Sequence, residues 1–168
     1  MRLRPEKNNI VYTDAAGDGG LGTVVIKFDH HASPFPSSSG QTPEWCAGEN
    51  IYTKELLKAV AGAAHIAEIG GSGPTIFFGD NDAACDALIR GTSDHDVPRL
   101  LIGAFWRTCI RARVTPWIGR VCSGKNVADN PSKMVKSSLA SPRNVFRLPT
   151  YVSTYENSKR FARWSYNE

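Results

Sequence analysis

The chain of 168 residues has a mass of 18.3 kDa, a formal net charge of +4, an apolar fraction of 41% and a charged fraction of 21%. These values predict a folded domain with a substantial core. They exclude a membrane-spanning chain, because no apolar run approaches the roughly 20 residues that cross a bilayer. Residues 1–7 lack the apolar centre of a signal peptide, so we expect an intracellular protein with no membrane partner, in the cytoplasm or nucleus.

The N-terminal half predicts strands followed by a helix. Residues 9–14 and 22–28 are rich in β-branched side chains, and the glycine-rich stretch between them predicts a hairpin with a loose turn. Residues 29–44 have the composition of a loop, and a short third strand is expected around residues 44–47. Residues 51–67 repeat apolar side chains at intervals of three and four, which predicts a helix.

The second half continues with alternating elements. We expect a strand at residues 75–79 and a helix at 82–90, capped by Asn81 or Asp80 and ended by Gly91. A longer helix is expected at 97–111, with Pro98 in its first turn. A strand at 113–121 contains Pro116, which favours an edge position or a bulge, and a short helix follows Asp129. The order βββ-α-β-α-α-β-α predicts an α/β fold, a mixed sheet covered by helices.

Charge divides the chain into two predicted parts. Residues 1–130 contain 13 basic and 14 acidic residues, whereas residues 131–168 contain 7 and 2. We therefore expect a catalytic domain at 1–136 and a basic, aromatic extension with little regular structure at 137–168. Such an extension could bring a polyanion to an acidic site, or it could pack against the sheet.

The cysteines and histidines show no metal-binding spacing. Cys46, Cys85, Cys109 and Cys122 form no Cys-x-x-Cys pair, so we expect free thiols in a reducing compartment. The adjacent pair His30-His31 is read as part of a solvated loop, because neighbouring side chains on an extended chain point in opposite directions.

Four carboxylates stand where a nuclease site would need them. Asp14 ends the first strand, Glu55 lies early in the first long helix, Asp80 closes the strand at 75–79, and Asp129 opens the last helix. Converging carboxylates could hold two divalent cations, which in-line phosphodiester hydrolysis uses. Asp82 is the rival for the third position, but Asp80 directly follows the apolar strand.

In their order and spacing these four motifs resemble the ribonuclease H superfamily. The string from Trp117 to Lys133 is similar to the ends of ribonuclease H domains in retroelement reverse-transcriptase polyproteins. The resemblance covers about residues 9–135. It implies a mixed five-stranded sheet whose first three strands are antiparallel. It also implies a monomeric domain, either free or within a larger polymerase polyprotein.

The resemblance implies an endonuclease that hydrolyses the RNA strand of RNA/DNA hybrids with two Mg²⁺ ions, for which Mn²⁺ would substitute. Asp14 would bridge both ions, Asp129 would complete the site of the ion that activates water, and Glu55 and Asp80 would hold the other. Small or polar neighbours of the carboxylates, and arginines along the DNA strand, would contact the substrate. These candidates are Ala15, Ala16, Asn81, Ser123, Lys125, Asn126, Arg107, Arg111 and Arg113.

The chain departs from the superfamily pattern in one loop, and two alternative functions remain open. Many members of the superfamily carry a His in the loop before the last Asp, whereas residues 122–125 contain none, which affects the expected turnover. A junction-resolving DNA nuclease on the same fold could use four similar carboxylates. A catalytically inactive ribonuclease H-like scaffold of a reverse transcriptase or ribonucleoprotein is the alternative from another class. Cleavage assays with different nucleic acids discriminate among the three.

Overall fold

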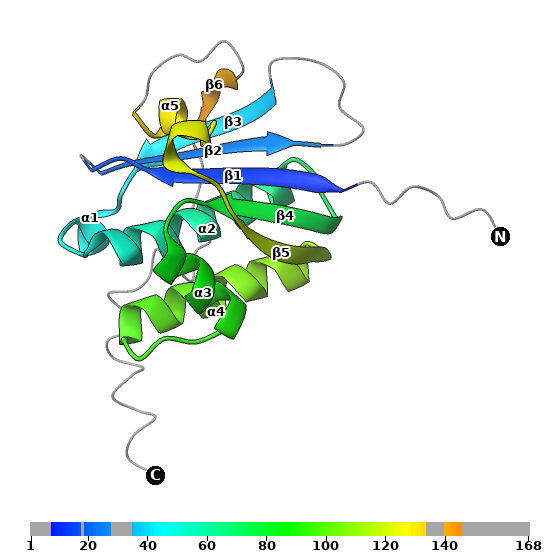
Figure 1. Cartoon of the computed structure of the whole chain (residues 1–168). Coiled ribbons are helices and arrows are strands. Elements are labelled where there is room, and N and C mark those ends of the chain that lie inside the picture. Colours follow the sequence, from blue (N-terminus) through cyan, green and yellow to red (C-terminus); the bar gives the residue numbers. More distant parts are fainter. Residues whose placement is uncertain (1–7, 18, 28–34, 134–139, 146–168) are drawn as a thin grey trace.

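A computed structural model describes residues 8–17, 19–27, 35–133 and 140–145 (Figure 1). A six-stranded sheet is combined with helices on both of its faces. The elements are β1 (Asn9–Ala15), β2 (Gly20–Ile26), β3 (Phe35–Gln41), α1 (Glu44–Ala47), α2 (Ile51–Glu68), β4 (Gly73–Gly79), α3 (Asp82–Arg90), α4 (Asp96–Arg111), β5 (Val114–Arg120), the 3₁₀ helix η1 (Ser123–Lys125), α5 (Asp129–Ser132) and β6 (Ala140–Val145).

The strand order is β5-β4-β1-β2-β3-β6. The pairs β1–β2 and β2–β3 are antiparallel, whereas β1–β4 and β4–β5 are parallel. Strands β1 to β5 confirm the predicted mixed five-stranded sheet with three antiparallel strands first, and β6 adds a sixth strand beside β3. The strand order also confirms the edge position of β5, which tolerates Pro116 because an edge strand leaves backbone groups outside the ladder.

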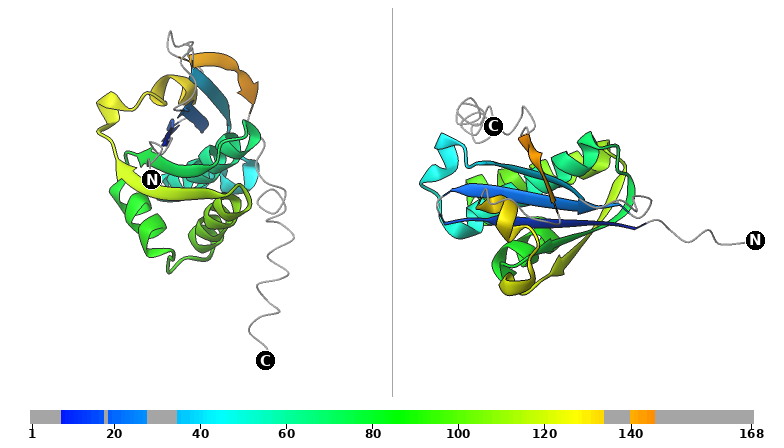
Figure 2. Two further views of the ribbon diagram at one scale, coloured as in Figure 1. Left: turned by 90° about the vertical axis from the view of Figure 1, so that its right-hand side faces the viewer. Right: turned by 90° about the horizontal axis from the view of Figure 1, so that it is seen from above.

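The two faces of β2 carry different helices. Successive side chains of a strand point to opposite faces. Thr23 contacts His65 of α2, whereas the neighbouring Gly22 lies against the backbone of α5. Helix α4 packs on α2, and in Figure 1 both lie below β1, whereas α5 lies near β3 and β6 at the top of the view. The two further views in Figure 2 show the same separation.

The main core lies between the sheet and α2, α3 and α4. Helix α2 begins at Asn50, whose side chain accepts a hydrogen bond from the Thr53 backbone, and is buried over most of its length. Helix α3 begins at Asn81, which caps Ala84 N, and ends at Gly91 with a positive φ of 73°. Both ends of α3 therefore follow the sequence prediction.

Three predictions on regular structure are wrong. The stretch 29–44 is not a loop throughout, because β3 lies within it, and residues 44–47 form α1 rather than a strand. The serines of β3 give no strand signal; β3 is a strand because its backbone pairs with β2. The extension at 137–168 contains β6, which pairs with β3 in parallel, so the expectation of little regular structure fails at residues 140–145.

The expectation of free cysteine thiols is confirmed. All four cysteines are free, and only Cys122 is exposed. Within the described part of the chain, no helix is long and apolar enough to cross a membrane. The pair His30-His31, and the part of the extension beyond residue 145, lie outside the described residues.

Candidate metal and nuclease site

Three of the four predicted carboxylates come together at one edge of the sheet. Asp14, Glu55 and Asp80 each offer an oxygen, and these oxygens lie within 4.8 Å of one another. Asp14 and Glu55 are buried and Asp80 is half-buried. Such a set of hard oxygen donors matches the coordination preferences of Mg²⁺ and Mn²⁺.

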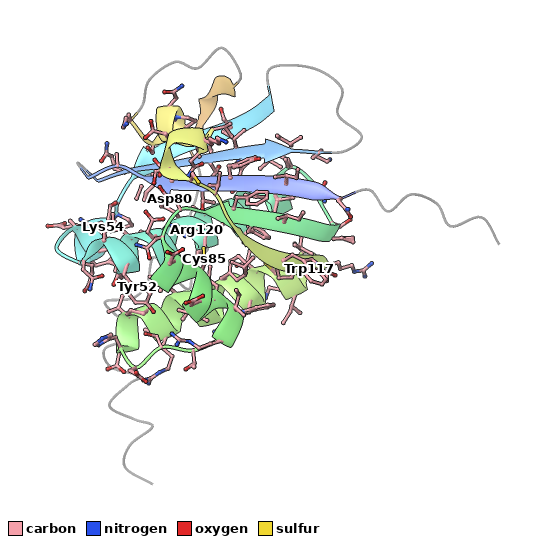
Figure 3. All side chains as sticks on the ribbon, in the orientation of Figure 1. Tyr52, Lys54, Asp80, Cys85, Trp117 and Arg120 are labelled. Atoms are coloured by element: carbon pink, nitrogen blue, oxygen red, sulfur yellow. The ribbon has the colours of Figure 1, made fainter. Side chains whose placement is uncertain are left out.

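The topology explains why these residues meet. Strands β1 and β4 are adjacent and parallel, with Tyr12 opposite Phe78, so Asp14 and Asp80 lie at the same C-terminal end of the two strands. Glu55 lies in the first half of α2, which packs across β1 and β2. Figure 3 shows Asp80 beyond the end of β4, at the same end of the sheet as Arg120 and Cys85 and away from Trp117.

A buried lysine lies within the carboxylate cluster. Lys58 Nζ is 2.7 Å from Glu55 Oε2 and 3.5 Å from Asp14 Oδ1, and its side chain is 0% exposed. Sequence reasoning missed this residue, although a lysine among Leu56, Leu57 and Ala59 on a buried helix was a visible signal. An ammonium can occupy such a place only because the carboxylates compensate for the loss of its hydration.

Burial raises the pKa of Glu55 to about 7. The neighbouring Lys58 opposes this rise by stabilising the charged carboxylate, whereas Asp80 and Asp14 reinforce it through like-charge repulsion. A cation placed against Glu55 would favour its ionised form. Added positive charge would therefore stabilise the ionised carboxylates of the cluster.

Helix α5 supplies a second set of contacts to the site. Ser132 Oγ donates a hydrogen bond to Asp14 Oδ2 at 2.6 Å. The Asn126 amide donates to the backbone oxygen of Thr13 at 2.8 Å, which ties the segment before α5 to β1. The backbone of α5 approaches β2 so closely that a Cβ added at Gly20 or Gly22 would overlap it. Both glycines are therefore required by the close approach of α5.

Asp129 is not part of the carboxylate cluster. Its carboxylate pairs with Lys133 Nζ at 2.8 Å, one turn along the chain, and both side chains are about half exposed. The backbone oxygen of Asp129 lies 2.8 Å from Ser132 Oγ and shares the single proton of that hydroxyl with Asp14, so Asp129 lies on the segment that contacts Asp14. Asp82, the rival of Asp80, points elsewhere and pairs with Arg120 at 2.7 Å.

The predicted substrate contacts fall into two groups. Asn126 is buried, and its side-chain amide forms hydrogen bonds with the backbones of Thr13 and Ala128, so it connects the segment before α5 to β1, and its contact with substrate stays a prediction. The Oδ1 atom of Asn81 caps α3. The others remain predictions: Ala15 is half-buried, Ala16 is buried, and Ser123, Lys125, Arg107, Arg111 and Arg113 are exposed.

The chain matches no protein-family model and none of the curated proteins. Among solved structures it is similar to the N-terminal RNase H domain of Rv2228c from Mycobacterium tuberculosis, solved as a fusion with maltose-binding protein. The two are 14% identical with a TM-score of 0.57, over 91% of this chain and 99% of that one. A second similar structure is RNase H1 from the halophilic archaeon Halobacterium salinarum, with 16% identity and a TM-score of 0.48, over 76% of this chain and 94% of that one.

The first of these similarities, together with the sheet topology, shows a ribonuclease H-like fold. The predicted fold class is therefore confirmed. Neither similarity bears on the retroelement resemblance, which stays a prediction.

Proposed function

We propose that this chain is a divalent-cation-dependent nuclease that hydrolyses the RNA strand of RNA/DNA hybrids. The observation that carries the proposal is the convergence of Asp14, Glu55 and Asp80 at one edge of a ribonuclease H fold. Carboxylates clustered within 4.8 Å repel one another when ionised, and a divalent cation relieves that repulsion.

The chain's own residues have distinct tasks in this proposal. Of the three clustered carboxylates, Asp80 is the most available to a cation, because it has no hydrogen bond or ion pair with any described residue. Ser132 fixes the orientation of Asp14, and the rigid helix α2 fixes Glu55. A bound cation would act as a Lewis acid that stabilises charge on the reacting phosphate and increases the acidity of water. Asp129 would take part only after separating from Lys133, which its exposed position permits.

A catalytically inactive ribonuclease H-like module is the second candidate. Two observations favour it: the Lys58 ammonium lies among the carboxylates, and Asp129 is engaged with Lys133. An inactive module would keep the fold and use the internal ion pairs in place of metal. A junction-resolving nuclease would share the acidic site, so the substrate distinguishes it.

The test is cleavage of labelled nucleic acids by the whole chain. RNA/DNA hybrid, duplex RNA, duplex DNA and a four-way junction are compared with Mg²⁺, Mn²⁺ and EDTA. We expect cleavage of the RNA strand of the hybrid alone, leaving 5′-phosphate and 3′-hydroxyl ends, and its loss in EDTA. Preference for the junction would identify a resolvase, and no cleavage of any substrate would support the inactive module.

Two matched variants connect the activity to the site. Asp80→Asn should remove nearly all cleavage while the protein stays folded, because the amide keeps the volume and loses the charge. Relief of repulsion should raise the metal-free stability by about 1 kcal/mol, the scale of a one-unit pKa shift. Asp82→Asn is the control and should stay active, because this exposed carboxylate pairs with Arg120 outside the cluster. The reverse pattern would contradict the assignment of Asp80.

A further inference from the structure

We propose that the Lys58 ammonium takes the place of one cation, so that the carboxylate cluster binds a single divalent ion rather than two. The inference rests on the proposed metal-dependent function and changes its stoichiometry. Lys58 Nζ already contacts one oxygen of Glu55 and one of Asp14, at 2.7 and 3.5 Å. Asp80 and the remaining lone pairs of the other two carboxylates are left for one ion.

Lys58 cannot make room for a second ion by turning into solvent. Its side chain is 0% exposed, and the adjacent positions of α2 are buried on every side. Lys133 provides a contrast, because its side chain is 54% exposed and can leave Asp129 without disturbing the core. Long cationic side chains normally keep their charged end in water, so a fully enclosed ammonium is held by its partners.

Charge balance leads to the same stoichiometry. One divalent ion and one ammonium carry three positive charges, which equal the charge of the three clustered carboxylates when all are ionised. Two divalent ions and the ammonium would exceed that charge, even if Asp129 joined the cluster. Like charges a few ångströms apart in a buried site repel strongly, so the second ion is disfavoured before nucleic acid arrives.

The test is a titration of the metal-free protein with Mn²⁺ that is monitored by calorimetry and by electron paramagnetic resonance. We expect one Mn²⁺ per chain and the six-line spectrum of an isolated ion. Two ions per chain with a spin-coupled spectrum would overturn the inference, and so would the absence of binding. This measurement uses the unaltered chain and therefore does not depend on how a variant folds.

A pair of lysine variants tests the cause. Lys58→Met keeps a long side chain and removes the charge, so we expect a second Mn²⁺ per chain or an affinity for the first that rises by about 10-fold, which corresponds to roughly 1.4 kcal/mol. We also expect a larger rise of Tm on adding Mn²⁺ than in the parent chain. Lys54→Met, on the same helix but outside the ion pairs of the cluster, is the control and should keep one ion.

The outcomes separate this inference from the proposed function. One Mn²⁺ together with hybrid cleavage supports both. Two Mn²⁺ with hybrid cleavage overturns the single-ion inference alone. One Mn²⁺ without cleavage of any nucleic acid overturns the proposed activity and leaves the role of Lys58 intact. If Lys58→Met binds Mn²⁺ with the stoichiometry and affinity of the parent chain, the ammonium does not act in place of a cation.

Discussion

Ser132 and Asp14 are 118 positions apart in the sequence and are joined by a hydrogen bond of 2.6 Å between Ser132 Oγ and Asp14 Oδ2. Both residues are buried. A hydroxyl donor to a carboxylate restricts the rotation of that carboxylate. Through this contact α5 controls the carboxylate at the end of β1, although its own acid, Asp129, stays outside the cluster.

Ser132→Ala should therefore weaken both the fold and the site. The buried Asp14 oxygen would lose its donor, and we expect the free energy of unfolding to fall by about 1–3 kcal/mol. Hybrid cleavage and Mn²⁺ affinity should fall as well, because Asp14 is less well oriented. Denaturant unfolding and metal titration measure these effects. Ser72→Ala, at an exposed position outside the predicted site, is the control; equal losses in the two variants would contradict the orienting role of Ser132.

Gly22→Ala should displace α5 from the sheet. An added Cβ would overlap the Ser132 backbone and lie 2.7 Å from Ala128 O, and neither backbone can move without disrupting the segment that contacts Asp14. We expect a loss of about 3 kcal/mol, at the upper end for overpacked positions, and reduced cleavage. Gly48→Ala is the matched control, because nothing lies within 4 Å of its added Cβ. Unfolding midpoints in denaturant test this, and an unchanged midpoint for Gly22→Ala would show that α5 can move freely.

We expect the buried His65 imidazole to make the fold less stable at acidic pH. His65 is buried, its Nδ1 lies 2.6 Å from Thr23 Oγ1 and 3.2 Å from Ser38 Oγ, and its Nε2 has no hydrogen-bond partner among the described residues. Burial lowers its pKa to about 4, from an ordinary value of 6.5. Protonation then favours the unfolded state, so stability should fall as the pH drops from 6.5 to 4, by on the order of 3 kcal/mol in total.

The contribution of His65 is measured by difference. Glu55 acts in the opposite sense, because its raised pKa makes stability increase as the pH falls from about 7 toward 4.5. His65→Gln removes only the imidazole, so the difference in unfolding free energy between parent and variant should change across pH 4–6.5. A constant difference over that range would show that His65 does not titrate as proposed.

Two truncations separate the sheet from the rest of the extension. Ending the chain after Lys136 removes β6 and leaves β3 as an unpaired edge, so we expect a lower Tm and a greater tendency to aggregate. Ending it after Val145 keeps β6 and should preserve Tm. This second truncation removes most of the basic and aromatic residues of the extension that could bind nucleic acid. The affinity for RNA/DNA hybrid should therefore fall and depend less steeply on salt, while the maximal rate stays almost unchanged. Equal Tm values for the two truncations would show that β6 adds no stability.

The sequence by itself determined the order of the main elements and the three acids that cluster, Asp14, Glu55 and Asp80. Local signals suffice for these features: Asn81 and Gly91 delimit α3, apolar periodicity predicts α2, and an acid directly after an apolar strand lies at the sheet edge. Once β1 and β4 are parallel neighbours, Asp14 and Asp80 must meet, and Asp80 rather than Asp82 joins the cluster.

Only the tertiary structure decided the features that depend on partners distant in the chain. Strands β3 and β6 form through backbone pairing, which their side chains do not predict. Lys58 enters the cluster because α2 is buried around it, and among the described residues its ion pairs are with Glu55 and Asp14. The exposed carboxylate of Asp129 instead pairs with Lys133, one turn away. Burial and pairing are properties of the assembled fold, and they determine the charge that the site presents to a cation.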